Sequence, residues 1–105
     1  MKSSHFALIE QFLNDNYKID GTYTINNDNT VDVDGTVKVK NRELESLTNG
    51  LFRFGIITHR FHCINCPNLK SLEGAPKKVG GYFWCDDCKN LMITDQDRKK
   101  YKIKG

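Results

Sequence analysis

Four cysteines arranged as two identical pairs are the residues of this chain with the clearest capacity for chemistry. Cys63 and Cys66 form one C-x-x-C pair, Cys85 and Cys88 form the other, and 18 residues separate the two pairs. In zinc ribbons, two such pairs deliver four thiolates to one tetrahedral ion. The spacing taken alone therefore favours a metal site.

An internal repeat supplies a second explanation for the same cysteines. Residues 57–69 align with residues 79–91 at a spacing of 22, and a phenylalanine, both cysteines, an asparagine and a leucine recur in place. Copying an element that contains C-x-x-C produces two pairs without any metal, and in leucine-rich repeats such cysteines occupy inward and turn positions. We therefore expect structural thiols and no cofactor. Zinc bound by all four cysteines stays open as the alternative.

A cysteine nucleophile is the third hypothesis, because His59 and His62 lie close to Cys63 in the sequence. Neighbouring residues on a strand point to opposite faces, so His62 should not reach Cys63. The chain also lacks a glycine-rich phosphate loop, a nucleophile elbow and an H-E-x-x-H pair. We expect a protein that is not an enzyme.

Length and composition indicate a single domain that spans residues 1–105, with 28% charged and 38% hydrophobic residues. No apolar run approaches the ~20 residues that cross a bilayer, and the first residues do not resemble an export signal. We expect a cytoplasmic protein with reduced thiols and no membrane partner.

The net charge of +3 is small, so nucleic acid is a less expected partner, although the C-terminal tail is basic. The oligomeric state stays open.

The elements that must position these residues follow from hydrophobic spacing. Ser3 or Ser4 can cap a helix in which Phe6, Ile9 and Leu13 recur at helical intervals. Alternating apolar residues predict two strands on either side of a turn at residues 26–29, and residues 95–101 suit a short polar helix. The predicted fold is α+β: a leucine-rich-repeat-like β solenoid of about three rungs over residues 36–94. A helix and hairpin would cap it over 1–35, and a short helix with a basic tail would cap it over 95–105.

Stacked rungs divide the strand residues into an interior and an exposed face. The interior set is Val37, Val39, Phe61, Cys63, Phe83 and Cys85. Their neighbours in the sequence then point outward, and Trp, Tyr and Arg are the residues most common at the energetic centres of interfaces. The predicted partner-binding residues are Lys38, Arg60, His62, Ile64, Tyr82, Trp84 and Asp86.

The string from Ser71 to Pro76, S-L-E-G-A-P, followed by Val79-Gly80-Gly81, resembles small leucine-rich-repeat-like proteins of tailed bacteriophages. The resemblance covers most of residues 23–91, although Thr58-His59 stands where the second copy has the glycine pair. It implies a phage origin and a repeat fold. From the resemblance together with the small size of the chain, we expect a protein in the host cytoplasm that binds and modulates a host protein, such as a defence factor. The alternative function is a zinc-ribbon nucleic-acid-binding protein, in which Tyr82 and Trp84 stack on bases and residues 98–104 track phosphates.

Overall fold

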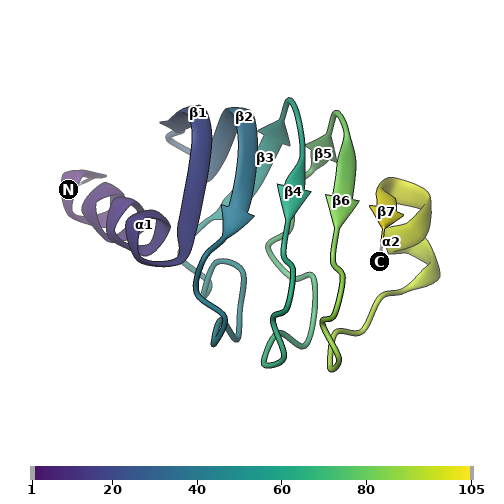
Figure 1. The fold of residues 1–105 in the computed structure, drawn as a ribbon. Helices are drawn as coiled ribbons and strands as arrows, with labels where there is room; N and C mark the ends of the chain where they lie inside the picture. The colour runs from purple at the N-terminus through teal and green to yellow at the C-terminus, as the bar shows by residue number, and fades with distance from the viewer. Residues whose placement is uncertain (1, 105) are drawn as a thin grey trace.

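The computed structural model describes the backbone of residues 2–104 and the side chains of residues 5–103. It has an α+β fold, as the sequence predicts, with two helices in the described range and one sheet whose pairings are mostly parallel. Helix α1 (Lys2–Asn16) lies at one end of the molecule and helix α2 (Asp95–Lys100) at the other (Figure 1). The proposed capping by Ser3 or Ser4 falls on side chains outside the described set. No helix in residues 2–104 has the length and apolar character that a bilayer span requires.

Helix α1 packs through one side and ends where the sheet begins. Ile9 and Leu13 lie one turn apart and are buried, as the helical spacing predicts. At the C-terminal end, Asn16 donates to the carbonyl of Phe12 and accepts a hydrogen bond from the Asn41 side chain at 2.8 Å. The helix is therefore tied to the segment that follows the second strand.

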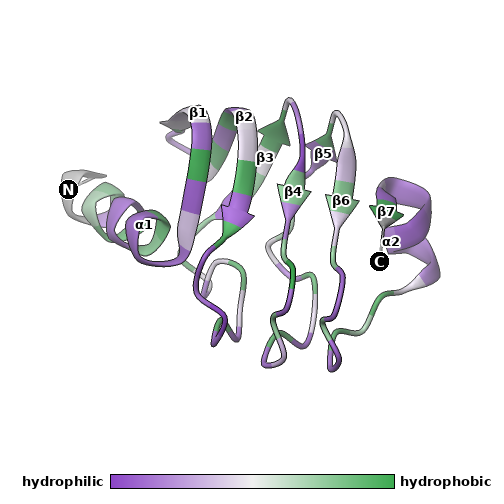
Figure 2. Cartoon of the chain, in the orientation of Figure 1, coloured by the Kyte–Doolittle hydropathy of each residue, from purple (hydrophilic) through white to green (hydrophobic). Residues whose placement is uncertain are grey.

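Strands β1 (Tyr17–Ile25) and β2 (Thr30–Val39) form an antiparallel hairpin, which confirms the predicted pair of strands. Hydrophobic and polar residues alternate along both strands, visible as alternating bands in Figure 2. The turn at residues 26–29 closes with Asn29 at φ 63°, a left-handed conformation that asparagine tolerates. Val31, Val33 and Val37 are all buried by this arrangement.

The remaining strands extend the sheet from β2 by parallel pairing. The two halves of β2 have different partners, because β3 pairs near Val31 and β4 pairs at Val37. Beyond them, β5 pairs with β3, β6 pairs with β4, and β7 pairs with β6. The five strands are β3 (Arg53–Ile57), β4 (Phe61–His62), β5 (Lys78–Val79), β6 (Tyr82–Trp84) and β7 (Lys102–Lys104).

Strand β2 changes partner at Gly35, which lies opposite Gly21 of β1. Their φ angles are 147° and 134°, outside the range that other residues readily adopt. A Cβ on Gly35 would collide with the carbonyl oxygen of Asp20. The Gly35 N–H donates to the Thr58 hydroxyl at 2.8 Å, and its carbonyl accepts from the His59 N–H at 3.1 Å. These bonds hold the corner between β3 and β4 against β2.

The core is built around phenylalanines from successive parallel strands. Phe61 and Phe83 are in register, and their rings stack with centroids 4.9 Å apart. Phe54 and Tyr17 pack edge-on against Phe61, and Tyr101 packs against Phe83 with ring centroids 4.8 Å apart. The predicted contact between Phe61 and Phe83 is thus confirmed.

The C-terminal segment contributes a helix that the sequence predicts and a strand that it does not. Thr94 caps α2 by accepting from the Asp97 N–H at 3.1 Å, while the Asp97 carboxylate accepts from the Thr94 N–H at 3.0 Å. The chain then turns at the buried Tyr101 and pairs with β6 as β7. The basic tail is therefore part of the sheet as far as residue 104.

We predict that Gly35→Ala lowers the free energy of unfolding by about 2 kcal/mol or more, because the new methyl meets backbone from β1 in a strained conformation. Urea unfolding followed by circular dichroism measures the effect. Gly50→Ala is the matched control: Gly50 has φ 71° but an open environment, so it should lose only about 1 kcal/mol. Equal losses in the two variants would contradict the close approach at the corner.

Candidate functional site

One continuous surface, here called the sheet face, is formed by outward residues of β1, β2, β4, β6 and β7. Of β1 and β2 it includes only the half that lies beside β4, on one side of the Gly21 and Gly35 pair. Lys18 lies opposite Lys38, Lys38 is in register with His62, and His62 is in register with Trp84. Arg60, Tyr82 and Lys102 form a second row of neighbours across the strands, next to the first. The sheet face consists of Lys18, Asp20, Thr36, Lys38, Lys40, Arg60, His62, Ile64, Tyr82, Trp84, Asp86 and Lys102.

An aromatic and apolar region occupies the β4 and β6 part of the sheet face. The His62 and Trp84 rings pack edge-on with centroids 5.6 Å apart. Ile64 is 41% exposed and Tyr82 is 39% exposed, while Trp84 is partly buried. These side chains point outward because Phe61 and Phe83, which alternate with them, fill the core. Tyr and Trp combine a large apolar surface with a polar group, and both are enriched at interfaces between proteins in general.

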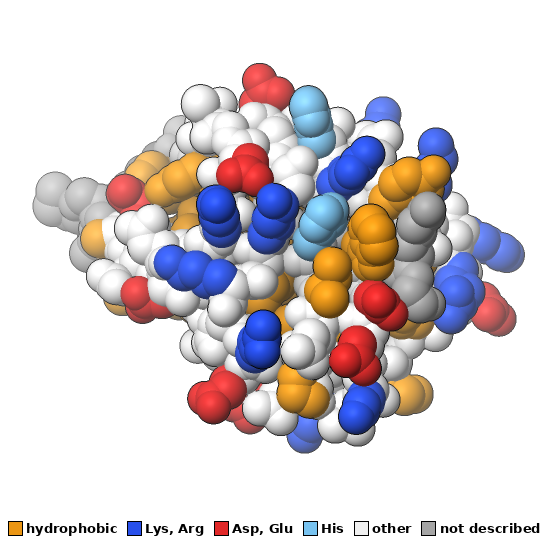
Figure 3. Space-filling model, viewed as in Figure 1, with side chains coloured by type: hydrophobic (Ala, Val, Ile, Leu, Met, Phe, Trp, Pro, Cys, Tyr) orange, Lys and Arg blue, Asp and Glu red, His pale blue; other side chains and the backbone are white. Residues whose placement is uncertain are grey.

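A basic region adjoins it over β1 and β2. Figure 3 shows Lys and Arg side chains gathered there, with a histidine between them and the hydrophobic side chains. Lys38 forms an ion pair with Asp20 at 3.1 Å, and this hydrogen bond from Lys38 lowers the pKa of the Asp20 carboxyl. Asp86, the other carboxylate of the sheet face, follows Trp84 along the chain, and Lys102 lies beside Tyr82 on β7. The charge is therefore distributed unevenly across the surface.

His62 lies where the basic and aromatic regions meet. Its Nε2 atom is buried and makes no hydrogen bond to any residue in the described range. Partial burial lowers the pKa of His62, and the nearby charges of Lys38 and Arg60 lower it further. Its neighbour on β6 is the uncharged Trp84. His62 is therefore a neutral ring at neutral pH.

The structure brings all seven predicted partner-binding residues together on the sheet face. The five further members of the sheet face, Lys18, Asp20, Thr36, Lys40 and Lys102, are not among the predicted partner-binding residues. Lys18 joins the face through the antiparallel register of β1, and Lys102 joins through β7. The alternation Lys102-Ile103-Lys104 is a strand signal that could have indicated the second of these.

The two C-x-x-C segments form equivalent stacked turns beneath the strands. Asn65 and Asp87 occupy the same left-handed position in each turn, with φ 59° and 58°. The Cys63 N–H donates to the Trp84 carbonyl at 2.7 Å, and the Asn65 N–H donates to the Asp86 carbonyl at 2.9 Å. Each turn then closes with a leucine N–H that donates to the carbonyl of the second cysteine. The two copies of the sequence repeat therefore form turns with the same backbone conformation and the same hydrogen bonds.

All four cysteines are free thiols, and three are buried in the hydrophobic core. Cys88 is partly exposed, and its thiol donates to the Cys63 carbonyl at 2.7 Å. Burial raises the pKa of the Cys66 thiol to about 11, and hydrogen bonding to Cys85 and Cys88 raises that of Cys63. Among residues with described side chains, no three Cys, His, Asp or Glu groups are arranged to hold a metal ion. His62 lies on the sheet face while Cys63 is fully buried, so these neighbours point apart.

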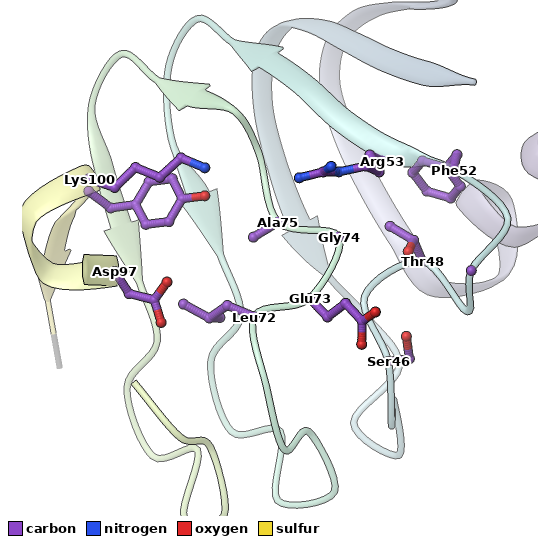
Figure 4. A pocket seen from close by; sticks show the side chains of 12 residues that line it. Ser46, Thr48, Phe52, Arg53, Leu72, Glu73, Gly74, Ala75, Asp97 and Lys100 are labelled. Atoms are coloured by element: carbon purple, nitrogen blue, oxygen red, sulfur yellow. The ribbon is translucent and has the colours of Figure 1, made fainter. Parts of the chain in front are cut away.

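A separate hollow of about 440 Å³ lies between the 46–53 segment, residues 72–75 and α2 (Figure 4). Arg53 and Lys100 reach into it from opposite sides, and Glu73 and Asp97 supply two carboxylates. The Asp97 carboxylate already accepts from the Thr94 N–H. None of the predicted partner-binding residues lines this hollow, and its mixed charge favours no single ligand class.

We predict that the protein purified without added metal contains far less than one zinc per chain. Chelator should leave its thermal unfolding midpoint unchanged, because the buried thiols pack as small apolar side chains. Elemental analysis and thermal unfolding with and without chelator provide the measurement. Zinc at one ion per chain that disappears in Cys66→Ser would instead establish the metal site.

We also predict that Lys38→Gln raises the pKa of His62, because it removes a nearby positive charge. The imidazole signals in an NMR titration report this directly. Lys40→Gln removes the same charge elsewhere on the sheet face and should change the His62 pKa less. Because the pKa of His62 is lower in the folded chain, the unfolded chain binds this proton more readily. Protonation of His62 therefore lowers the free energy of unfolding as the pH falls below 6.5. A His62 pKa that is unaffected by Lys38→Gln would contradict the proximity of the two groups.

Comparison with known proteins assigns no activity to the sheet face. No protein-family model, curated protein or solved structure shows a significant match to this chain.

Proposed function

We propose that the chain is a non-enzymatic protein-binding module that contacts its partner through the sheet face. The observation that carries this proposal is the adjacency of Trp84, Tyr82 and Arg60, the three residue types most enriched at interface hot spots. Tyr82 and Trp84 stand on a paired strand beside a stacked aromatic core, so these two rings lose little conformational entropy when they are covered. A surface of this kind suits binding to another folded surface.

The proposal includes a finer description of the fold, as a short leucine-rich-repeat-like solenoid of about three rungs. The register of Val37, Phe61 and Phe83 supports it, because the last two are equivalent positions of the 22-residue repeat. The equivalent turns after β4 and β6 support it as well. Repeat proteins commonly bind partners through the continuous face that stacking creates.

The resemblance to small bacteriophage proteins extends the proposal to the class of partner. A phage-encoded binding module without catalytic residues can modulate a host protein, such as a defence factor, by occupying a surface which that protein needs. Blocking by occupancy requires only affinity and shape complementarity. Both can be supplied by a small domain with one exposed aromatic region.

Capture from host lysate tests the proposal, with the double variant Trp84→Ala plus Arg60→Ala compared against the unaltered protein. We predict that specific capture is lost, because truncating a hot-spot residue typically costs about 2 kcal/mol or more, roughly 30-fold in Kd. The matched control is Arg42→Ala plus Met92→Ala, which removes one exposed cation and one exposed apolar side chain outside the sheet face. Circular dichroism should show that both variants fold. The proposal fails if the sheet-face variant captures the same proteins as the control.

A further inference from the structure

We infer that the partner presents an acidic protein segment with an adjoining apolar residue to the sheet face. The carboxylates would lie over the basic region, and the apolar residue would rest against Trp84 and Tyr82. This inference rests on the proposed function and specifies the chemistry of the partner.

The first observation is the concentration of charge. Among the residues with described side chains, the sheet face holds five cations against two carboxylates, a surplus as large as the formal net charge of +3 of the whole chain. One of those carboxylates, Asp20, is already paired with Lys38. Positive charge is therefore concentrated on the sheet face. Its cations are Lys18, Lys38, Lys40, Arg60 and Lys102.

The second observation is the boundary of this basic region. Past the Gly35 corner the outward side chains become acidic, but they are engaged within the chain: Asp32 accepts from the Ile56 N–H at 2.8 Å, and Asp34 accepts from the Thr58 hydroxyl at 3.0 Å. On the opposite side of the aromatic region, Lys102 lies beside Tyr82 on β7, and Asp86 follows Trp84 along the chain. The complementary ligand thus carries negative charge over β1 and β2 and none beside Asp86.

This boundary favours a protein segment over a nucleic acid. A single strand carries one phosphate for each base, so stacking a base on Trp84 would bring phosphates near Asp86 as well as near Lys38. A polypeptide can place carboxylates over the cations and leave the position beside Asp86 uncharged. It can therefore match the uneven charge of the sheet face residue by residue.

Trp84 is the only tryptophan in the chain, so its fluorescence reports occupation of the sheet face directly. The probe is a short glutamate peptide that ends in leucine, with blocked termini, titrated at low ionic strength because exposed charges are screened over about 10 Å at 0.1 M salt. We predict a saturable change in fluorescence with this peptide and none with its glutamine counterpart. A thymidine oligonucleotide of the same net charge is the third ligand and should bind more weakly than the glutamate peptide.

Charge reversal locates the binding on the protein. Lys38→Glu plus Arg60→Glu should raise the Kd for the glutamate peptide by about tenfold or more. Lys70→Glu plus Lys89→Glu makes the same change in net charge at exposed positions outside the sheet face and should leave the Kd close to that of the unaltered protein. Equal weakening in the two double variants would show attraction by net charge alone and overturn the inference. Tighter binding of the oligonucleotide, or no fluorescence change with the glutamate peptide, would overturn it too.

The same variants separate this inference from the proposed function. If capture from lysate depends on Trp84 but is unaffected by Lys38→Glu plus Arg60→Glu, the sheet face binds protein and the acidic specificity is wrong. If capture is unaffected by both changes, the proposed function itself is wrong.

Discussion

The stacking of Phe61 on Phe83 is the contact on which the rest of the structure depends. The two rings are parallel neighbours on paired strands and are fully buried. Side chains alternate along a strand, so when Phe61 and Phe83 point into the core, the residues before and after each of them must point outward. Arg60, His62, Tyr82 and Trp84 are exposed to some degree for that reason alone. An offset aromatic pair also adds about 0.5–1.5 kcal/mol beyond the burial of its surface.

Glycine at the corner of β2 makes that stacking compatible with a second set of strands. Val31 and Val33 must face the core together with Phe54, while Val37 must face it together with Phe61. The three valines alternate in one phase along β2, and the paired glycines at positions 21 and 35 mark the point where the partner strand changes from β3 to β4. The sheet face begins on the far side of this corner. Its position is therefore set by backbone geometry as well as by side-chain polarity.

The cysteines illustrate how one pattern can support opposite interpretations. Their spacing is that of a zinc ribbon, and their placement in stacked turns is that of a structural repeat. In the folded chain three of the thiols contact the core as small apolar groups, and the turns are held by backbone hydrogen bonds between equivalent residues. On the opposite side of the strands, which faces outward, cations and aromatic rings are adjacent. That adjacency is the basis of the proposed binding surface.

The sequence by itself determined the elements that depend on local pattern. Helical spacing placed Ile9 and Leu13 on one side of α1, alternation defined the hairpin, and the repeat brought Phe61 next to Phe83. Only the tertiary structure decided which cations share the sheet face, because the antiparallel register puts Lys18 beside Lys38 and the pairing of β7 puts Lys102 beside Tyr82. Register between strands distant in sequence is set by core packing of the whole chain, which no local pattern encodes. The same holds for the burial that lowers the pKa of His62, because Lys38 and Trp84 reach it only from neighbouring strands.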